Sequence, residues 1–204
     1  MSNEIYKGCI KFRIGTLDYL QEFGDGDYKR DVNDALTACH LYDGYKYRTK
    51  NKQAFWCTTQ ELSSLTGLSP RRVDASIHTL SQLLNVFYKH TTFDELTHKN
   101  RRDFTGCRLN FDSLIWFPYR PIKEFDFNVR KSLMYCYIKF GTESQTGKLI
   151  ATAGDIAYEF GVKTVSTVSK ELKAMAEDGF IEITYFDDGC IQSITTTNKE
   201  VHYE

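Results

Sequence analysis

Apolar residues recur at helical spacing in two stretches of the chain. In residues 70–84 they follow one another at steps of four, three and four, and in residues 165–177 at steps of four and three. The first stripe consists of Val73, Ile77, Leu80 and Leu84, and the second of Val168, Leu172 and Met175. Because this spacing places each set on one side of a helix, both stretches are predicted to be helices with one buried face.

Each of these helices is followed by sequence typical of a β-hairpin. After the first, the strand-like residues 85–90 and 107–111 enclose a polar stretch, 91–106, which is predicted to be a loop. After the second, residues 179–186 and 190–197 flank an Asp-Asp-Gly turn. Asp-Gly between two β-type runs strongly favours a hairpin.

A short internal repeat precedes both helices. The sequences "TTQELSSLTGLS" at 58–69 and "TAGDIAYEFGVK" at 152–163 align at an offset of 94 residues. Each opens with Thr-x-x-acid, in which the hydroxyl can cap a helix and the carboxylate can accept from the cap's backbone N–H. Each contains a glycine, Gly67 or Gly161, that can adopt a left-handed turn before the long helix. The repeat predicts a helix-turn-helix in each half of the chain.

A further helix is predicted upstream of each repeat, in residues 31–45 and 128–142. The order in each half is therefore helix, helix, turn, helix and β-hairpin. Over residues 31–113 and 126–197 this order resembles the winged helix-turn-helix family of DNA-binding domains. The likeness is carried by "TTQELSSLTGLSPRRVDASIHTLSQLLNVF" and "TAGDIAYEFGVKTVSTVSKELKAMAEDGFIEI". It implies an α+β, mainly α fold with two tandem winged helix-turn-helix domains, each of three helices plus a β-hairpin wing.

The two halves are separated by "WFPYRPIKEFD", in which two prolines interrupt regular structure. We predict an N-terminal domain of residues 1–117, which includes a strand in residues 8–14 and a short helix after it, and a C-terminal domain of residues 122–204. Two such domains behind this N-terminal segment resemble the initiators of plasmid or phage replication. That resemblance implies sequence-specific binding to double-stranded DNA, with a homodimer or host replication proteins as further partners.

Charge is distributed unevenly along the chain, although its net value is −1. Residues 1–120 carry 17 basic and 14 acidic side chains, whereas residues 121–204 carry 9 and 13. Residues 44–108 alone carry 11 basic and 5 acidic side chains. A basic surface in the N-terminal half is therefore compatible with the near-neutral total, and such a surface attracts polyanions.

Composition narrows the class of protein. No apolar run approaches the roughly 20 residues that span a membrane, and the N-terminus lacks a basic segment followed by an apolar one. We expect a cytoplasmic protein without a membrane partner. The six cysteines are scattered and never form Cys-x-x-Cys, and the five histidines do not join them at a ligand spacing. Reduced thiols, no metal and no cofactor are expected.

The helix predicted in residues 70–84 carries polar side chains opposite its apolar stripe. An arginine there can pair with guanine, a glutamine with adenine, and an alanine permits close approach to the major groove. A solvated arginine pair is the ordinary alternative for Arg71 and Arg72, but a helix N-terminus disfavours cations unless an anion is bound. The expected DNA contacts of this helix are Ser69, Arg71, Arg72, Ala75, Ser76, His78, Thr79 and Gln82.

Three other segments are weaker candidates for DNA contact. The polar loop of the first hairpin could touch phosphate, and the run "YKYRTKNK" at 45–52 could stack bases or line a phosphate track, although both could equally be solvated loops. The second long helix offers residues suited to phosphate rather than to bases, and its alternative role is dimerisation or partner binding. The corresponding residues are Lys99, Arg101 and Arg102 in the loop, Lys46, Arg48 and Lys50 in the run, and Ser166, Thr167, Lys170 and Lys173 in the helix.

Catalytic motifs are not evident in the sequence. "GTESQTGKL" at 141–149 has five residues between its glycines where a phosphate-binding loop needs four, and it ends in leucine rather than serine or threonine. The acidic residues of "GDGDYKRDVND" lack the spacing of a calcium loop and suit the start of a helix. We expect a non-enzymatic replication initiator. The alternatives are a winged-helix transcriptional regulator and a winged-helix protein-interaction or dimerisation module without DNA contact.

Overall fold

The computed structural model of the chain shows an α+β, mainly helical protein with seven α-helices in its described part. The described residues are 8–24, 27–44, 46, 55–83, 87–94, 99–105, 115–143 and 147–203. For Trp56 and the strand residues 87–94 and 99–105, only the backbone is described. The chain divides into two compact units, Met1–Trp116 and Phe117–Glu204. The division falls beside Pro118, within the proline-containing sequence between the two halves.

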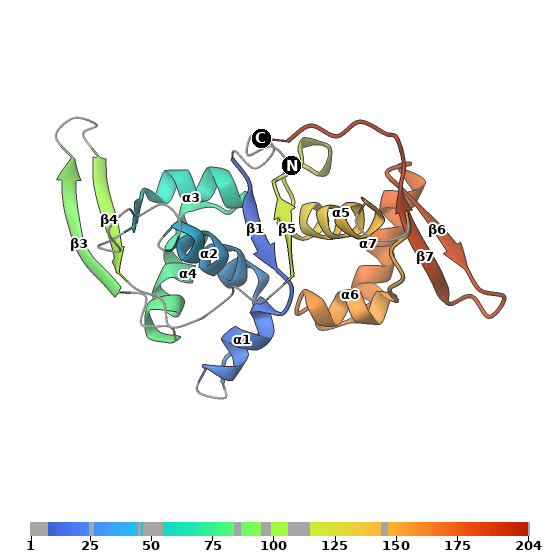
Figure 1. Cartoon of the computed structure of the whole chain (residues 1–204), viewed down its shortest axis with the longest axis horizontal. Helices are drawn as coiled ribbons and strands as arrows, with labels where there is room; N and C mark the ends of the chain where they lie inside the picture. Colours follow the sequence, from blue (N-terminus) through green and yellow to red (C-terminus); the bar gives the residue numbers. More distant parts are fainter. Residues whose placement is uncertain are drawn as a thin grey trace. The chain divides into compact units, whose positions relative to one another are not determined.

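Unit 1 is built around the buried helix α2 (Figure 1). Its elements are β1 (Ile10–Arg13), α1 (Thr16–Glu22), α2 (Val32–Asp43), β2 (Phe55–Cys57), α3 (Thr59–Thr66), α4 (Pro70–Leu83), β3 (Phe87–Asp94) and β4 (Lys99–Thr105). Helix α2 packs against α4 and β1, and its Leu36 and Cys39 are fully buried. The strand and short helix expected near the N-terminus are confirmed as β1 and α1.

The helix-turn-helix of unit 1 forms as its local sequence predicts. Thr58 and Glu61 make a complete capping box, in which the Thr58 hydroxyl accepts from the Glu61 N–H at 3.1 Å and the Glu61 carboxylate accepts from the Thr58 N–H at 2.6 Å. Gly67 ends α3 with φ 73°, a left-handed conformation that favours glycine. Three residues of turn after α3 lead directly into α4 at Pro70.

The hairpin of unit 1 differs from the sequence prediction. Strand β3 continues to Asp94 and β4 begins at Lys99, so most of the stretch expected to be a loop is paired antiparallel strand. The error has a physical cause, since this stretch is rich in threonine and phenylalanine, whose branched or aromatic side chains favour strands even among charged neighbours. The strand expected at residues 107–111 lies outside the described residues.

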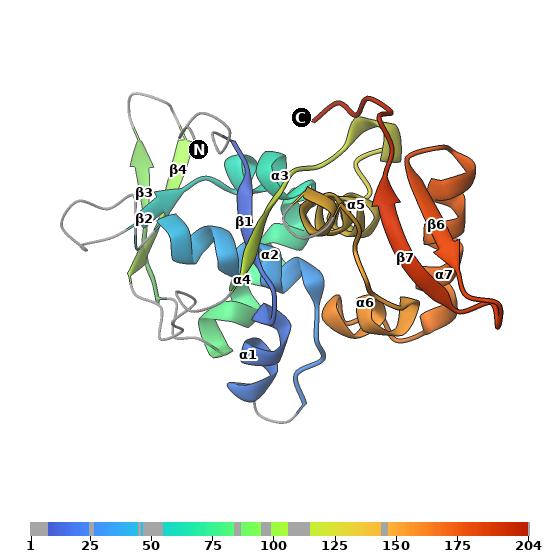
Figure 2. The same ribbon diagram turned by 45° about the vertical axis from the view of Figure 1, so that its right-hand side comes forward.

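Unit 2 repeats the order of helices and strands (Figure 2). Its elements are η2 (Lys123–Phe125), α5 (Val129–Gly141), α6 (Ala153–Glu159), α7 (Val165–Glu177), β6 (Ile181–Tyr185) and β7 (Ile191–Thr196), and β5 (Trp116–Tyr119) leads into it from unit 1. A second capping box joins Thr152 to Asp155, and both views show the β6–β7 hairpin that follows α7. The Asp-Asp-Gly turn is confirmed, with Gly189 at φ 81°. Phe125 and Phe180 stack edge to face in the core at 4.9 Å between ring centroids.

A third sheet segment occurs at the same place in both units, and the sequence pattern did not predict it. In unit 1, β2 pairs antiparallel with β4, and Phe55 lies opposite Phe104. In unit 2, Leu149 forms an antiparallel bridge with Ile194 of β7. Each segment lies between the first helix and the capping box, and each pairs with the second strand of the hairpin. Phe55 and Leu149 are separated by the same 94 residues as the repeat.

Candidate nucleic-acid interface

Helix α4 presents a buried and an exposed face. Val73, Ile77 and Leu80 of the predicted stripe are buried, as expected from their spacing, and Leu84 lies outside the described residues. The exposed face, opposite the stripe, carries Arg71, Ala75, His78 and Gln82. His78 and Gln82 lie one turn apart and their side chains meet at 3.3 Å between Nε2 atoms. The face is free to approach a ligand because α2 and α3 pack against the other side of α4.

The start of α4 is fixed by its own sequence. The Ser69 hydroxyl accepts from the Arg72 backbone N–H at 3.3 Å, and Pro70 occupies the first helical position, where its missing N–H costs nothing. Ser69 is exposed, so its cap function is compatible with a ligand nearby. Arg71 is exposed at this N-terminus, and no described residue pairs with it.

Arg72 corrects the expectation that both arginines face outward. Its Nη2 donates to Asp31 Oδ2 and lies 3.8 Å from Asp34 Oδ1, both on the first turn of α2 or its cap. Asp31 thereby has two functions, because its other oxygen, Oδ1, caps α2 by accepting from the Asn33 N–H at 2.8 Å. The sequence indicated the cap but not the ion pair, which joins residues 41 positions apart. Arg72 is therefore a link between α2 and α4 rather than a free cation.

Ser76 is a second correction among the expected contacts. It is fully buried and lies beside Asp34, so it cannot reach a ligand at the exposed face of α4. Its position explains this, because it lies three residues after Val73 and next to Ile77, at the edge of the apolar stripe. Thr79 is half-buried, and its hydroxyl donates to the Ala75 carbonyl at 3.2 Å.

Asp34 occupies a poorly solvated position between α2 and α4. Burial raises the pKa of its carboxyl to about 6, and the nearby Asp31 charge acts in the same direction. The nearby Ser76 and Tyr28 hydroxyls and the charge of Arg72 lower this pKa but do not offset the burial. Burial and the Asp34 carboxylate in turn raise the pKa of Tyr28. The joint between the two helices is thus sensitive to protonation near pH 6.

An acidic residue that we did not anticipate lies on the exposed side of α4. Asp74 is exposed, three residues after Arg71, and its carboxylate accepts from the Thr59 hydroxyl at 3.3 Å. A carboxylate in this place repels phosphate but can accept from the amino group of cytosine. Sequence alone shows the Arg71 to Asp74 spacing, whereas the link to the start of α3 is visible only in the structure.

The other basic residues expected in unit 1 are described only in part. Lys99, Arg101 and Arg102 are residues of strand β4, paired with Asp94, Thr92 and Thr91, rather than of a loop tip. In the run at 45–52, Lys46 is exposed and its Nζ lies 3.0 Å from the Tyr42 hydroxyl. Arg48 and Lys50 lie outside the described residues.

The corresponding surface of unit 2 has a different charge pattern. On α7, Ser166, Lys170 and Lys173 are exposed, and Thr167 is half-buried with its hydroxyl 2.7 Å from that of Thr164. The predicted stripe of Val168, Leu172 and Met175 is buried. The turn of the β6–β7 hairpin carries Asp187 and Asp188, both exposed. In unit 2 the cations of the helix therefore lie beside an acidic hairpin turn.

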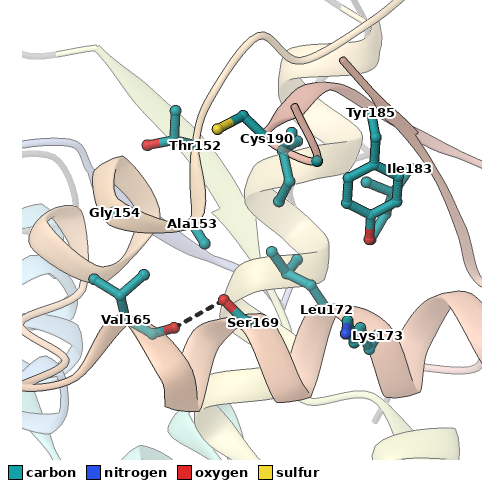
Figure 3. A pocket seen from close by; sticks show the side chains of 12 residues that line it. Thr152, Ala153, Gly154, Val165, Ser169, Leu172, Lys173, Ile183, Tyr185 and Cys190 are labelled. Carbon is teal, nitrogen blue, oxygen red and sulfur yellow. Dashed lines mark hydrogen bonds between the residues drawn. The ribbon is translucent and has the colours of Figure 1, made fainter. Parts of the chain in front are cut away.

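A groove of about 390 Å³ separates α7 from the β6–β7 hairpin (Figure 3). Leu172, Ile183 and Ile191 line it, together with the exposed side chains of Val165 and Tyr185. In Figure 3 the Ser169 hydroxyl donates to the Val165 carbonyl along α7, a bond of 3.1 Å. The groove is therefore mainly apolar where α7 and the hairpin face each other.

No protein-family model, curated protein or solved structure matches the chain. Within the described residues, no group of three or more His, Cys, Asp or Glu side chains could hold a metal ion. None of the described helices has the length and apolarity needed to cross a membrane. The cysteines described are free thiols, four of them buried and Cys190 exposed.

Proposed function

We propose that the chain is a double-stranded DNA-binding protein with two tandem winged helix-turn-helix domains, and that α4 of unit 1 reads the DNA. The order of helices and strands in each unit supports this fold assignment. The observation that carries the proposal is the exposed face of α4, where Arg71, Ala75, His78 and Gln82 lie opposite the buried stripe. A helix anchored in this way can enter the major groove, which is wide enough to admit it.

Arg71 is the central residue of the proposed interface. It is exposed on the first turn of α4, where backbone N–H groups and the helix dipole also favour an anion. Its guanidinium can bind a phosphate or pair with a guanine. Arg72 supports the interface indirectly, because its ion pairs with Asp31 and Asp34 fix α4 against α2.

The hairpin of unit 1 is the second proposed contact. Strand β4 contains Lys99, Arg101 and Arg102, and the sequence of residues 44–108 has an excess of six basic side chains. In unit 2, Asp187 and Asp188 at the hairpin turn would repel phosphate, so Ser166, Thr167, Lys170 and Lys173 of α7 are weaker candidates for DNA contact. We therefore assign sequence reading to unit 1.

The proposed role is that of a non-enzymatic, cytoplasmic initiator of plasmid or phage replication, which recruits host replication proteins to an origin. A transcriptional regulator would use the same interface, and its site would be one inverted repeat at a promoter rather than several short sites beside an AT-rich tract. A module that binds only protein would not bind duplex DNA at all. These three functions are separated by the number and arrangement of the sites bound.

A fluorescence-anisotropy titration of a random duplex tests the DNA-binding proposal. If Arg71, Lys89, Lys99, Arg101 and Arg102 neutralise five phosphates, the logarithm of the binding constant should fall with the logarithm of salt concentration at a slope of about −4.5. Arg71→Ala should weaken binding at least tenfold, a loss of about 1.4 kcal/mol. It should leave the melting temperature unchanged, since Arg71 is exposed and no described residue pairs with it.

Lys123→Ala is the matched control for this titration. It removes one exposed positive charge from η2 of unit 2, which is part of neither α4 nor α7, and should leave the affinity within about twofold. Absence of duplex binding by the wild-type protein, or equal affinities for wild type and Arg71→Ala, would refute the proposed role of α4.

A further inference from the structure

The groove between α7 and the β6–β7 hairpin combines exposed apolar side chains with rims of opposite charge. Val165 and Tyr185 line the groove with 50% and 45% of their surfaces exposed. Large apolar side chains at this exposure, gathered beside an open apolar groove, are typical of a surface that binds another protein. Because the groove lies within unit 2, its geometry depends on that unit alone.

The basic rim of the groove belongs to α7. Lys173 lines the groove, and Lys170 lies three residues earlier on the same helix. Both side chains are exposed, and neither forms an ion pair with a residue in the described part of the chain. Their charges are therefore available to an incoming surface.

The acidic rim belongs to the hairpin turn. Asp187 and Asp188 directly precede Gly189 and Cys190, which line the groove. Asp188 Oδ1 accepts from the Cys190 N–H at 2.8 Å, a bond that keeps the turn closed. Neither aspartate is paired with a cation among the described residues. The two rims thus carry opposite charges on either side of an apolar centre.

We propose that this groove binds a second copy of the same chain, with the two copies related by a two-fold axis. A two-fold interface uses the same patch on both partners, so the patch must be complementary to itself. Rotation by 180° places the Lys170 and Lys173 rim of each copy over the Asp187 and Asp188 rim of the other copy. The apolar side chains that line the groove, Val165 and Tyr185 among them, then face the apolar lining of the other copy, and buried aromatic residues contribute strongly to binding.

Other kinds of ligand would complement the charge of only one of the two rims. Nucleic acid would be attracted by the lysines but repelled by the aspartates, and a peptide of a single charge would complement only one rim. A second copy neutralises both rims at once. If unit 1 binds DNA as proposed above, the dimer would present two reading helices related by symmetry, and its site would be an inverted repeat. That consequence depends on the proposed function, whereas the dimer itself does not.

Charge reversal with mixing tests the dimer in the absence of DNA. The two variants are Lys170→Glu with Lys173→Glu, and Asp187→Lys with Asp188→Lys. Sedimentation velocity should show a wild-type dimer, and each variant alone should dissociate at least tenfold more readily, because like charges then face each other across both rims. An equimolar mixture should recover the dimer, since each altered rim of one variant meets the oppositely altered rim of the other.

Tyrosine substitution tests the apolar centre with a matched control. Tyr185→Ser should raise the dimer dissociation constant at least tenfold, whereas Tyr158→Ser should not change it. Tyr158 is more exposed, at 61%, but lies on α6 and does not line the groove. Circular dichroism melting of each variant checks that unit 2 remains folded.

Three results would overturn the proposal. They are a monomeric wild-type protein at the highest soluble concentration, folded charge variants that dimerise as well as wild type, and a mixture of folded monomeric variants that fails to recover the dimer. Duplex binding is measured separately with Arg71→Ala, so failure of the dimer and failure of DNA binding give different results.

Discussion

In each unit an ion pair joins the last long helix to the first long helix, but the cation and the anion are exchanged between the two helices. In unit 1 the cation is Arg72 on α4, and the anions are Asp31 and Asp34 at the start of α2. In unit 2 the cation is Arg130 at the start of α5, and the anion is Glu171 on α7, 3.5 Å away. In both units the partners of the closest pair are 41 residues apart.

The two joints show that an ion pair between these helices can form with either direction of charge. The direction nevertheless determines which charges remain on the outer face. In unit 1 the joint uses one of two adjacent arginines and leaves Arg71 exposed. In unit 2 the joint uses an acidic residue of α7 and leaves Lys170 and Lys173, beside an acidic turn, without an ion-pair partner among the described residues. A similar order of helices and strands thus carries the proposed DNA-reading surface in one unit and the proposed self-complementary groove in the other.

The largest expected effect concerns Asp34, the buried carboxyl in the joint of unit 1. The raised pKa of Asp34, about 6 against an ordinary 3.8, means that the folded protein holds this proton more tightly than the unfolded chain. The free energy of unfolding should therefore fall as pH rises from about 4 to about 6, by up to about 3 kcal/mol from this group.

Asp34→Asn should remove that contribution. Urea denaturation gives the free energy of unfolding of wild type and variant at pH 4 and at pH 7. The contribution of Asp34 is the amount by which the difference between the two proteins changes between these pH values. The wild type should lose stability relative to Asp34→Asn as the pH rises. A difference that is the same at both pH values would show that the carboxyl is not held in a protonated form by burial.

The next effect compares the two cations of the joints. Arg72→Ala leaves the buried Asp34 without its cation and should destabilise unit 1 by about 2 kcal/mol at pH 8, below the usual cost for a fully buried pair because Arg72 is 38% exposed. The loss should be smaller at pH 5, where Asp34 is protonated. Arg130→Ala should cost about 1 kcal/mol, because Arg130 is 43% exposed and is paired with one carboxylate, Glu171, whereas Arg72 lies beside two.

Arg71→Ala is the internal control for these stability measurements. It removes the neighbouring arginine from the exposed face and should change the free energy of unfolding by less than about 0.5 kcal/mol. Equal losses for Arg71→Ala and Arg72→Ala in urea denaturation would contradict the different functions assigned to the two arginines.

The smallest effect tests what the units share. Thr58→Ala and Thr152→Ala each remove the hydroxyl of a capping box, and each should cost about 1 kcal/mol in thermal or urea unfolding. Ser64→Ala, at an exposed position within α3, should cause no loss because alanine favours a helix interior. A much larger loss in one unit than in the other would indicate that the two boxes are not equivalent.

Features encoded within a few residues were predictable from the sequence. The capping boxes, the left-handed Gly67, the buried stripes and the Asp-Asp-Gly hairpin all depend on neighbours along the chain, and the structure confirms them. The first hairpin was wrong in its details, because polarity suggested a loop where threonine and phenylalanine favour strands. Strand β2, which pairs with β4, and Leu149, which bridges to β7, are too short to give a recognisable sequence pattern.

The candidate site was predictable only as far as the orientation of its helix. Helical spacing identifies Arg71, Ala75, His78 and Gln82 as an outer face, and all four are exposed. Spacing cannot show that Asp31 reaches across to Arg72, because the contact depends on how α2 and α4 pack. The same packing buries Ser76 beside Asp34. The helix pattern alone places Ser76 at the edge of the apolar stripe and does not show that it is buried.

The central claim is that Arg71 of unit 1 reads a base or positions the helix that does. Selection of preferred duplexes from a random pool tests this most directly, with wild type, Arg71→Ala and Lys123→Ala selected in parallel. Wild type and Lys123→Ala should enrich the same site, whereas Arg71→Ala should lose preference for at least one base pair of it or enrich no site. Enrichment of an identical site by Arg71→Ala with undiminished preference at every position would contradict the account.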